Sequence, residues 1–204
     1  GRLWEASQGQ IRILTIAPEA VGTQFNELFI WAKKRKIILS LGHSHASQTQ
    51  AREYLDKGVQ NVTHLWNAQA FHHRKPGIPG AAIGHPSAFV ELITDGHHVA
   101  PEVIEWTFKA HPASRIIRIS DCAPAAALAA GEQATFGPIQ VIRAPLEGPC
   151  QTLTGHLAGG GSLLSRQTRF PGISPKDWEL SARTAPLSAL GLSGAKLKAF
   201  LKKI

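Results

Sequence analysis

The strongest constraint on the fold is a repeated pattern, in which a short apolar run is followed by a polar or ionisable residue. Most of these runs then lead into a helical pattern. The runs are Ile11–Ala17, Ile37–Leu41, Val62-Thr63, Phe89–Thr94 and Arg115–Ser120. Strands buried on both faces and alternating with helices are typical of a parallel sheet. The pattern therefore predicts an α/β fold.

The intervening segments predict helices. We expect one over about residues 20–36, where apolar residues recur at helical spacing, and one over about residues 47–57, which Gly58 would end. A third should begin at Pro101, because proline suits the first helical turn.

Ordinary packing does not explain why ionisable residues follow the predicted strands. Glu19, His43, His64, His98 and Asp121 all stand at or just past the carboxyl ends. In a β/α barrel these ends converge on one mouth, where such enzymes place their chemistry. An open sheet would spread them along an edge. The coincidence favours a barrel with a site at its mouth.

One glutamate and two histidines form a familiar ligand set for a catalytic divalent metal ion. We predict a single ion held by Glu19, His43 and His64, most readily zinc, with iron, manganese or cobalt as the other candidates. A metal ion activates water and polarises a carbonyl group, as amide hydrolysis requires. Asp121 would be the general base and acid.

Each of these residues also has a purely structural interpretation. A single histidine is more often a surface or core residue than a ligand, Glu19 could stabilise a helix start, and Asp121 could cap a helix. Their joint occurrence on successive strand ends favours the functional interpretation.

The segment from Asn61 to Ala82 adds features of a substrate site. Asn67 and Arg74 follow His64 closely, and Lys75–Gly80 is predicted to be a loop over the site. Arginine suits phosphate because its planar fork donates two hydrogen bonds.

The formal charge of +8 raises the possibility of a nucleic-acid partner. The basic residues, however, gather at the end of a predicted helix and at the carboxyl terminus without interleaved aromatic residues, which favours solvated faces. No apolar run is long enough to cross a membrane. We therefore predict no nucleic acid, no membrane association and a cytoplasmic location, with Cys122 and Cys150 as free thiols.

Seven segments run collinearly through about three quarters of the chain: LTIAPE (14–19), LGHSHA (41–46), VTHLWNA (62–68), HHRKPGIPGAA (72–82), DGHHV (95–99), ISD (119–121) and HLAGG (156–160). Together these segments resemble the N-acetylglucosamine-6-phosphate deacetylases of the amidohydrolase superfamily.

The resemblance implies a (β/α)8 TIM-like barrel that removes acetate from N-acetylglucosamine 6-phosphate by metal-activated water in amino-sugar catabolism. It also implies the same metal ligands, and Asp121 as catalytic acid and base. Substrate contacts are implied for Asn67, Ala68, Arg74, His98, Leu157, Ala158 and Gly159. In this family the phosphate-binding arginine comes from the other subunit of a homodimer, so Arg74 is expected to act across an interface.

The chain lacks the family's opening segments, namely strands of a small β-sandwich and a His-x-His pair. We therefore expect a one-metal site and a barrel incomplete at the amino terminus over residues 1–194. Residues 195–204 would begin the return to a largely missing β-sandwich, or form a tail. The alternative functions are another metal-dependent amidohydrolase, or a catalytically dead remnant that binds metal or a partner.

Overall fold

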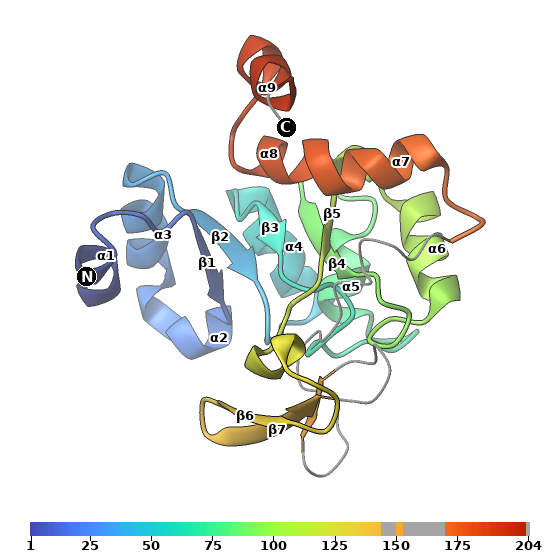
Figure 1. Cartoon of the computed structure of the whole chain (residues 1–204). Helices are drawn as coiled ribbons and strands as arrows, with labels where there is room; N and C mark the ends of the chain where they lie inside the picture. Colours follow the sequence, from blue (N-terminus) through green and yellow to red (C-terminus); the bar gives the residue numbers. More distant parts are fainter. Residues whose placement is uncertain (144–149, 153–169, 203–204) are drawn as a thin grey trace.

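The computed structural model describes residues 1–143, 150–152 and 170–202 of the chain. Its centre is a five-stranded parallel sheet in the order β1-β2-β3-β4-β5, so strands adjacent in sequence are adjacent in space (Figure 1). The strands are β1 (Ile13–Ile16), β2 (Ile38–Leu41), β3 (Asn61–Val62), β4 (Phe89–Ile93) and β5 (Ile116–Ile119). The prediction of an α/β fold with a parallel sheet is confirmed.

Helices connect the strands and pack against the sheet. Those before β5 are α1 (Arg2–Ala6), α2 (Pro18–Val21), α3 (Phe25–Lys34), α4 (Gln48–Lys57), α5 (Gly77–Ala82) and α6 (Pro101–Ala110). Short 3-10 helices are η1 (Gly22–Gln24), η2 (Ala113–Arg115) and η3 (Pro124–Ala127). The helices near the carboxyl terminus are α7 (Pro175–Glu179), the π-helix η5 (Leu180–Thr184), α8 (Ala185–Ala189) and α9 (Gly194–Leu201).

Local sequence explains the helix ends. Ser47 and Gln50 form a reciprocal capping box at the start of α4, and Gly58 ends it in the left-handed region at φ 107°. Pro101 opens α6 as predicted. The single helix predicted over residues 20–36 is wrong, because Gly22 with φ 58° interrupts it and η1 separates α2 from α3. Lys75–Gly80 is not all loop, because α5 begins at Gly77.

The two faces of the sheet differ in polarity. Side chains alternate along each strand, and one set joins the main core under the helices, including Leu39, Leu41, Val62, Val90, Leu92 and Ile116. The other set includes Ser40, Asn61 and Glu91. We call the face that carries Ser40, Asn61 and Glu91 the inner face. Parallel strands are usually apolar on both faces, so the polar side chains on this face indicate a site nearby.

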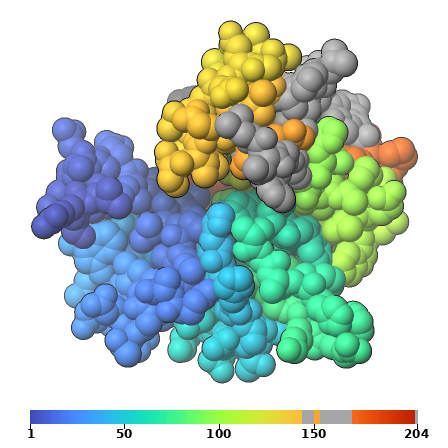
Figure 2. All heavy atoms as spheres, turned by 90° about the horizontal axis from the view of Figure 1, so that it is seen from below, coloured from blue at the N-terminus to red at the C-terminus, as the bar shows by residue number. Residues whose placement is uncertain are grey.

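A second sheet of three antiparallel strands was not predicted. It consists of β6 (Gln133–Phe136), β7 (Ile139–Arg143) and β8 (Cys150–Thr152). Phe136 pairs with Ile139 across a two-residue turn, in which Gly137 has a φ of 58°. The hairpin lies beyond the carboxyl ends of the central strands (Figure 1) and forms a raised part of that face in Figure 2.

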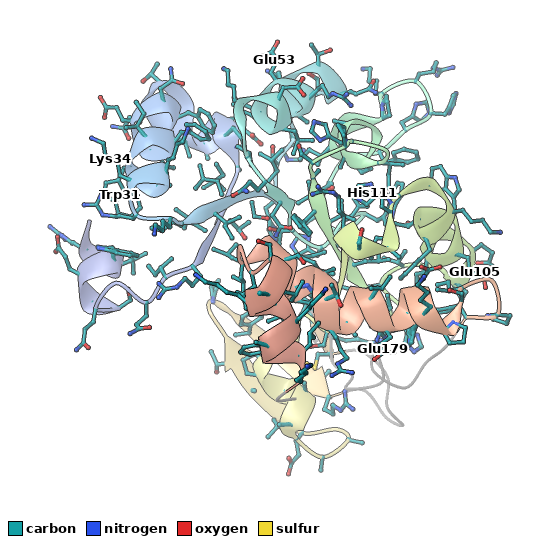
Figure 3. All side chains as sticks on the ribbon, turned by 90° about the horizontal axis from the view of Figure 1, so that it is seen from above. Trp31, Lys34, Glu53, Glu105, His111 and Glu179 are labelled. Atoms are coloured by element: carbon teal, nitrogen blue, oxygen red, sulfur yellow. The ribbon has the colours of Figure 1, made fainter. Side chains whose placement is uncertain are left out.

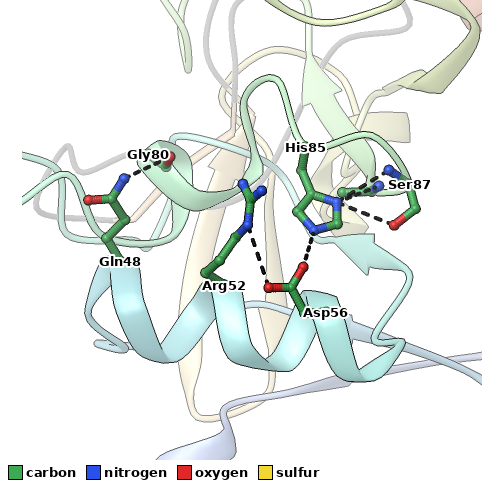
Figure 4. A network of polar contacts seen from close by, with 7 residues as sticks. Gln48, Arg52, Asp56, Gly80, His85 and Ser87 are labelled. Carbon is green, nitrogen blue, oxygen red and sulfur yellow. Dashed lines mark hydrogen bonds and ion pairs between the residues drawn. The ribbon is translucent and has the colours of Figure 1, made fainter.

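A network away from the sheet edge fixes the connection between α5 and β4 (Figure 4). Nδ1 of the buried His85 accepts from the backbone N–H groups of Ser87 and Ala88, at 3.3 and 3.2 Å. The proton must therefore be on Nε2, which donates to Asp56 at 3.1 Å. The hydrogen bonds of His85 therefore give it a structural role.

Both cysteines are free thiols, as predicted. No helix within the described ranges is long and apolar enough to cross a membrane.

Candidate metal and acid–base site

The predicted residues follow neighbouring strands at one edge of the sheet. Glu19 follows β1, His43 follows β2, His64 follows β3 and Asp121 follows β5, each within three residues of the strand end. Because all five strands are parallel, these positions lie on the same side of the molecule, the side seen in Figure 2.

The structure brings His43 and His64 into direct contact. Their Nε2 atoms are 2.8 Å apart, and the ring planes are inclined by 79°. Burial and the neighbouring His64 lower the pKa of His43, against an opposing effect of the Asp121 carboxylate. The lowered pKa favours the neutral form of the His43 ring, which is the form that binds a metal ion.

The backbone is strained at the same positions. Seven non-glycine residues in the described ranges have positive φ, and five of them lie in or beside the candidate site: His43, His64, Trp66, Ala68 and Asp121. Such conformations cost roughly 1–3 kcal/mol each and cluster at functional sites. The concentration of strain here favours function over ordinary packing.

Glu19 is beside these residues but is occupied by other partners. Its carboxylate accepts from the Ser44 hydroxyl at 2.7 Å and from the His45 backbone N–H at 2.6 Å. Burial acts to raise the pKa of Glu19, but these hydrogen bonds outweigh it and leave the pKa below its ordinary value. Glu19 is therefore an ionised carboxylate bound to the two residues that directly follow His43.

These residues fit a divalent cation in donor chemistry. The two Nε2 atoms face each other, and Nδ1 of His64 is buried without a hydrogen-bond partner in the part of the chain described. An imidazole pair of this kind suits zinc and similar ions. Within the described ranges, no three His, Cys, Asp or Glu side chains are gathered closely enough to form a complete cluster.

Asp121 is exposed and lies two residues beyond the end of β5. Its charge acts on both His43 and Glu91, which places it within electrostatic range of the imidazole pair. It has no helix-capping hydrogen bond, since the N-cap of η3 is Ala123. The interpretation of Asp121 as a helix cap is therefore wrong.

His98 is held by a carboxylate that the prediction did not include. Asp95 accepts from Nδ1 of His98 at 2.7 Å and from the backbone N–H groups of His97 and His98, both at 2.9 Å. Both side chains of the pair are buried, with exposed fractions of 2% for Asp95 and 6% for His98. Nε2 of His98 is buried and has no partner among the described residues, so its lone pair is available to a ligand.

Replacing Asp95 by asparagine should therefore destabilise the fold and change the tautomer of His98. Burial acts to raise the pKa of Asp95, but the hydrogen bonds from His98 and His97 outweigh it and lower the pKa. A lowered carboxyl pKa contributes stability at neutral pH, and this contribution is lost as the pH falls through the folded-state pKa. We expect Asp95→Asn to cost roughly 1.5–3 kcal/mol at pH 7.

Urea unfolding at several pH values checks this. The difference between wild type and variant should shrink as the pH falls below the ordinary carboxyl pKa, and a constant difference would contradict the account. The nitrogen chemical shifts of the His98 imidazole should show that the proton lies on Nδ1 in the wild type and on Nε2 in the variant.

Gly42 allows the strand end that carries His43 to lie close to its neighbours. A Cβ atom at this position would lie 2.7 Å from Cγ2 of Thr15 and 2.8 Å from Cβ of Thr63. We expect Gly42→Ala to lower the free energy of unfolding by about 1–3 kcal/mol through overpacking. Adding Thr15→Ser removes the closer methyl group and should restore part of the loss, measured by urea unfolding. No recovery would show that this overlap is not the cause.

The remaining predicted contacts are less closely tied to the imidazole pair. Asn67 donates through Nδ2 to the Leu65 carbonyl at 3.5 Å, and Ala68 is exposed with φ 49°. Arg74 is exposed in a turn closed by hydrogen bonds between His72 and Lys75. Leu157, Ala158 and Gly159 lie outside the described residues.

Sequence reasoning missed the polar side chains below the imidazole pair. Thr63 Oγ1 is 2.9 Å from the Thr15 hydroxyl and 2.6 Å from the Ser40 hydroxyl, and Asn61 donates to Glu91 at 2.7 Å. The signal that could have revealed this layer is an acidic residue inside the otherwise apolar run Phe89–Ile93.

Comparison with known proteins decides the family relationship. N-acetylglucosamine-6-phosphate deacetylase from Vibrio furnissii is 32% identical over 191 residues, which are 91% of this chain and 46% of the relative. The chain is a homologue of the N-acetylglucosamine-6-phosphate deacetylases. No family model matches it.

The deacetylase relatives include a protein with a different sugar in its name and a solved structure with a bound ligand. N-acetylgalactosamine-6-phosphate deacetylase from Escherichia coli O157:H7 is 29% identical over 95% of this chain and 51% of its own length. A mutant N-acetyl-D-glucosamine-6-phosphate deacetylase from Mycobacterium smegmatis, in complex with N-acetyl-D-glucosamine-6-phosphate, matches with a TM-score of 0.82. It is 27% identical, and the match covers 97% of this chain and 53% of that one. The chain thus spans about half the length of the deacetylases it matches.

Proposed function

We propose that this chain carries the metal-binding and acid–base residues of an enzyme that hydrolyses N-acetylglucosamine 6-phosphate to glucosamine 6-phosphate and acetate. The observation that carries the proposal is the contact of His43 with His64 at 2.8 Å, between Nε2 atoms, beside Asp121 at the same sheet edge. All three residues have left-handed backbone conformations.

The two imidazoles would hold one divalent cation, most readily zinc, and Glu19 is the carboxylate we assign to the same ion. When bound, the cation supplies a Lewis acid for amide hydrolysis. Glu19 is already ionised and bound next to His43, so it needs no deprotonation to take this role.

Asp121 acts as the general base and then as the general acid. Its carboxylate takes a proton from the attacking water and returns it to the nitrogen of the leaving amine. Its exposed position beyond the end of β5 leaves it accessible to both groups.

We assign His98 and Arg74 to the substrate. Asp95 occupies Nδ1 of His98 and leaves Nε2 without a partner among the described residues, so we assign Nε2 to a hydrogen bond with a sugar hydroxyl. Arg74 is an exposed guanidinium suited to a phosphate, and its exposure allows it to reach the substrate of a second subunit. Asn67, Ala68 and the segment Leu157–Gly159 complete the proposed contacts.

The parallel sheet is, in this proposal, part of a (β/α)8 amidohydrolase barrel whose mouth is the carboxyl edge. The burial of polar side chains on the inner face supports it, because Ser40 and Asn61 are 0% and 1% exposed, whereas an open two-layer sheet would leave one face in contact with solvent. A homodimer belongs to the same proposal, because Arg74 is assigned to the substrate of a second subunit. A cytoplasmic location also belongs to it, since a phosphorylated sugar does not cross membranes freely.

N-acetylgalactosamine 6-phosphate is a second candidate substrate, favoured by the relative from E. coli O157:H7, which matches 95% of this chain. Both sugars share the acetamide and the phosphate, so the same residues would serve either one.

Acetate release from both phosphorylated sugars and from unphosphorylated N-acetylglucosamine tests the substrate class. We expect turnover of N-acetylglucosamine 6-phosphate to exceed that of the unphosphorylated sugar, and Arg74→Ala to reduce this preference. Equal rates with and without phosphate would favour another amidohydrolase activity. A faster rate with the galactosamine compound would favour the second candidate.

A further inference from the structure

Glu91 is a carboxylate in the middle of β4 that has no part in the proposed reaction. It lies on the opposite face of the strand from the fully buried Val90 and Leu92, and therefore points to the polar inner face. Burial raises the pKa of this carboxyl group. An acidic residue retained at such a position needs partners that offset its desolvation.

Those partners lie on β3 and on the turn that follows it. Asn61, with an exposed fraction of 1%, donates through Nδ2 to Oε1 of Glu91 at 2.7 Å. The backbone N–H of His64 also donates toward the carboxylate. In addition, the Leu65 backbone N–H donates to the Glu91 carbonyl oxygen at 2.7 Å. Glu91 therefore binds the His64–Leu65 turn through both its side chain and its main chain.

The turn needs such a restraint because of its conformation. His64 has φ 32°, which an L-residue with a bulky side chain rarely adopts. A left-handed residue at the end of a strand directs its side chain differently from an extended one. The direction of the His64 ring toward His43 thus depends on groups that hold the backbone in this form.

We propose that Glu91 is a positioning residue that fixes the His64 turn and so directs the His64 imidazole to the metal. The inference rests on the proposed function, in which His43 and His64 bind a cation. It adds a residue that supports a ligand without touching the ion, the substrate or the reacting atoms.

The donors around Glu91 suit a carboxylate better than an amide. Two N–H donors, from Asn61 and from His64, approach one side chain. A glutamine at this position has one neutral oxygen in place of two charged ones, and its NH2 group would oppose any N–H donor that approached the second oxygen, so the contact is weakened. Glu91→Gln keeps the size of the side chain and removes one acceptor.

Zinc affinity, measured by competition with a chromogenic chelator, tests the proposal. Loss of a partner that supports a metal ligand typically weakens metal binding by about 10- to 100-fold, and we expect this for Glu91→Gln. Val90→Ala is the matched control, because it removes buried volume from the same strand on the opposite face. It should lower the thermal midpoint while leaving the zinc dissociation constant at the wild-type value.

Two results would overturn the proposal: wild-type zinc affinity in Glu91→Gln, or an equal loss in Val90→Ala. Glu53→Gln, at an exposed glutamate that points outward from α4 (Figure 3), controls for the change of charge and should have no effect.

A second measurement needs neither metal nor a folded variant. Amide hydrogen exchange in the metal-free wild-type chain should show the His64 N–H to be protected, because it faces the Glu91 carboxylate. Exchange at the rate of a solvent-exposed amide would contradict the role of Glu91. Failure of the wild-type chain to bind zinc would instead count against the proposed metal site, and the exchange result would still decide on the contact.

Discussion

Asp121→Asn is expected to reduce acetate release from N-acetylglucosamine 6-phosphate by roughly 10²- to 10⁴-fold, the usual contribution of a general acid–base group. Asparagine is well suited to this comparison because it tolerates left-handed backbone, and Asp121 has φ 49°. The variant therefore removes the proton acceptor while retaining the local conformation.

Three measurements make this result specific to proton transfer. Steady-state kinetics should place the loss in kcat rather than KM, zinc affinity should remain within a few-fold of wild type, and Glu53→Gln should retain full activity. Full activity in Asp121→Asn would contradict its role. Loss of zinc together with loss of activity would show that Asp121 acts as a ligand instead.

His64→Asn should have the largest effect on the metal. The substitution removes the ring nitrogen that lies 2.8 Å from Nε2 of His43, and asparagine again tolerates the positive φ at this position. We expect zinc affinity to fall by more than roughly 100-fold, beyond the loss of a supporting partner. Zinc-dependent activity should fall with it.

The matched control is His73→Asn, at an exposed histidine of the His72–Lys75 turn that precedes α5. Its zinc dissociation constant should equal that of wild type. A His64→Asn chain that bound zinc as tightly as wild type would exclude the imidazole pair as the metal site.

The positions of the site residues along the fold could be predicted from the sequence. Each apolar run becomes a strand, and the residue types at its end need no knowledge of side-chain packing. The capping signals at Ser47 and Gly58 act over a few residues, so the ends of α4 can also be predicted from the sequence. The parallel order of the strands then brings His43 and His64 to one edge.

The direction of each side chain could not be predicted in the same way. Glu19 binds Ser44 and the His45 backbone, a choice that depends on how the end of β1 meets the turn after β2. The acidic residue Glu91 is visible within an apolar run, but its partner Asn61 could not be predicted, because that contact depends on the pairing of β3 with β4. Asp95 was quoted within a motif, but its hydrogen bond to His98 depends on the turn formed by residues 95–98.

The antiparallel sheet was missed for a different reason. The signal was present, since Gly137 and Pro138 separate two short runs of high strand propensity. These runs are short and are not followed by a helical pattern, so they do not belong to the alternation of strand and helix that predicts the parallel sheet.

Zinc-dependent acetate release by the wild-type chain is the direct test of whether this protein is a metal-dependent deacetylase. The metal-free chain should release no acetate from N-acetylglucosamine 6-phosphate, and stoichiometric zinc should restore turnover that a chelator abolishes. Equal release with and without zinc would contradict the proposed metal chemistry. No release by a chain that binds zinc through His43 and His64 would identify it as a metal-binding protein without deacetylase activity of its own.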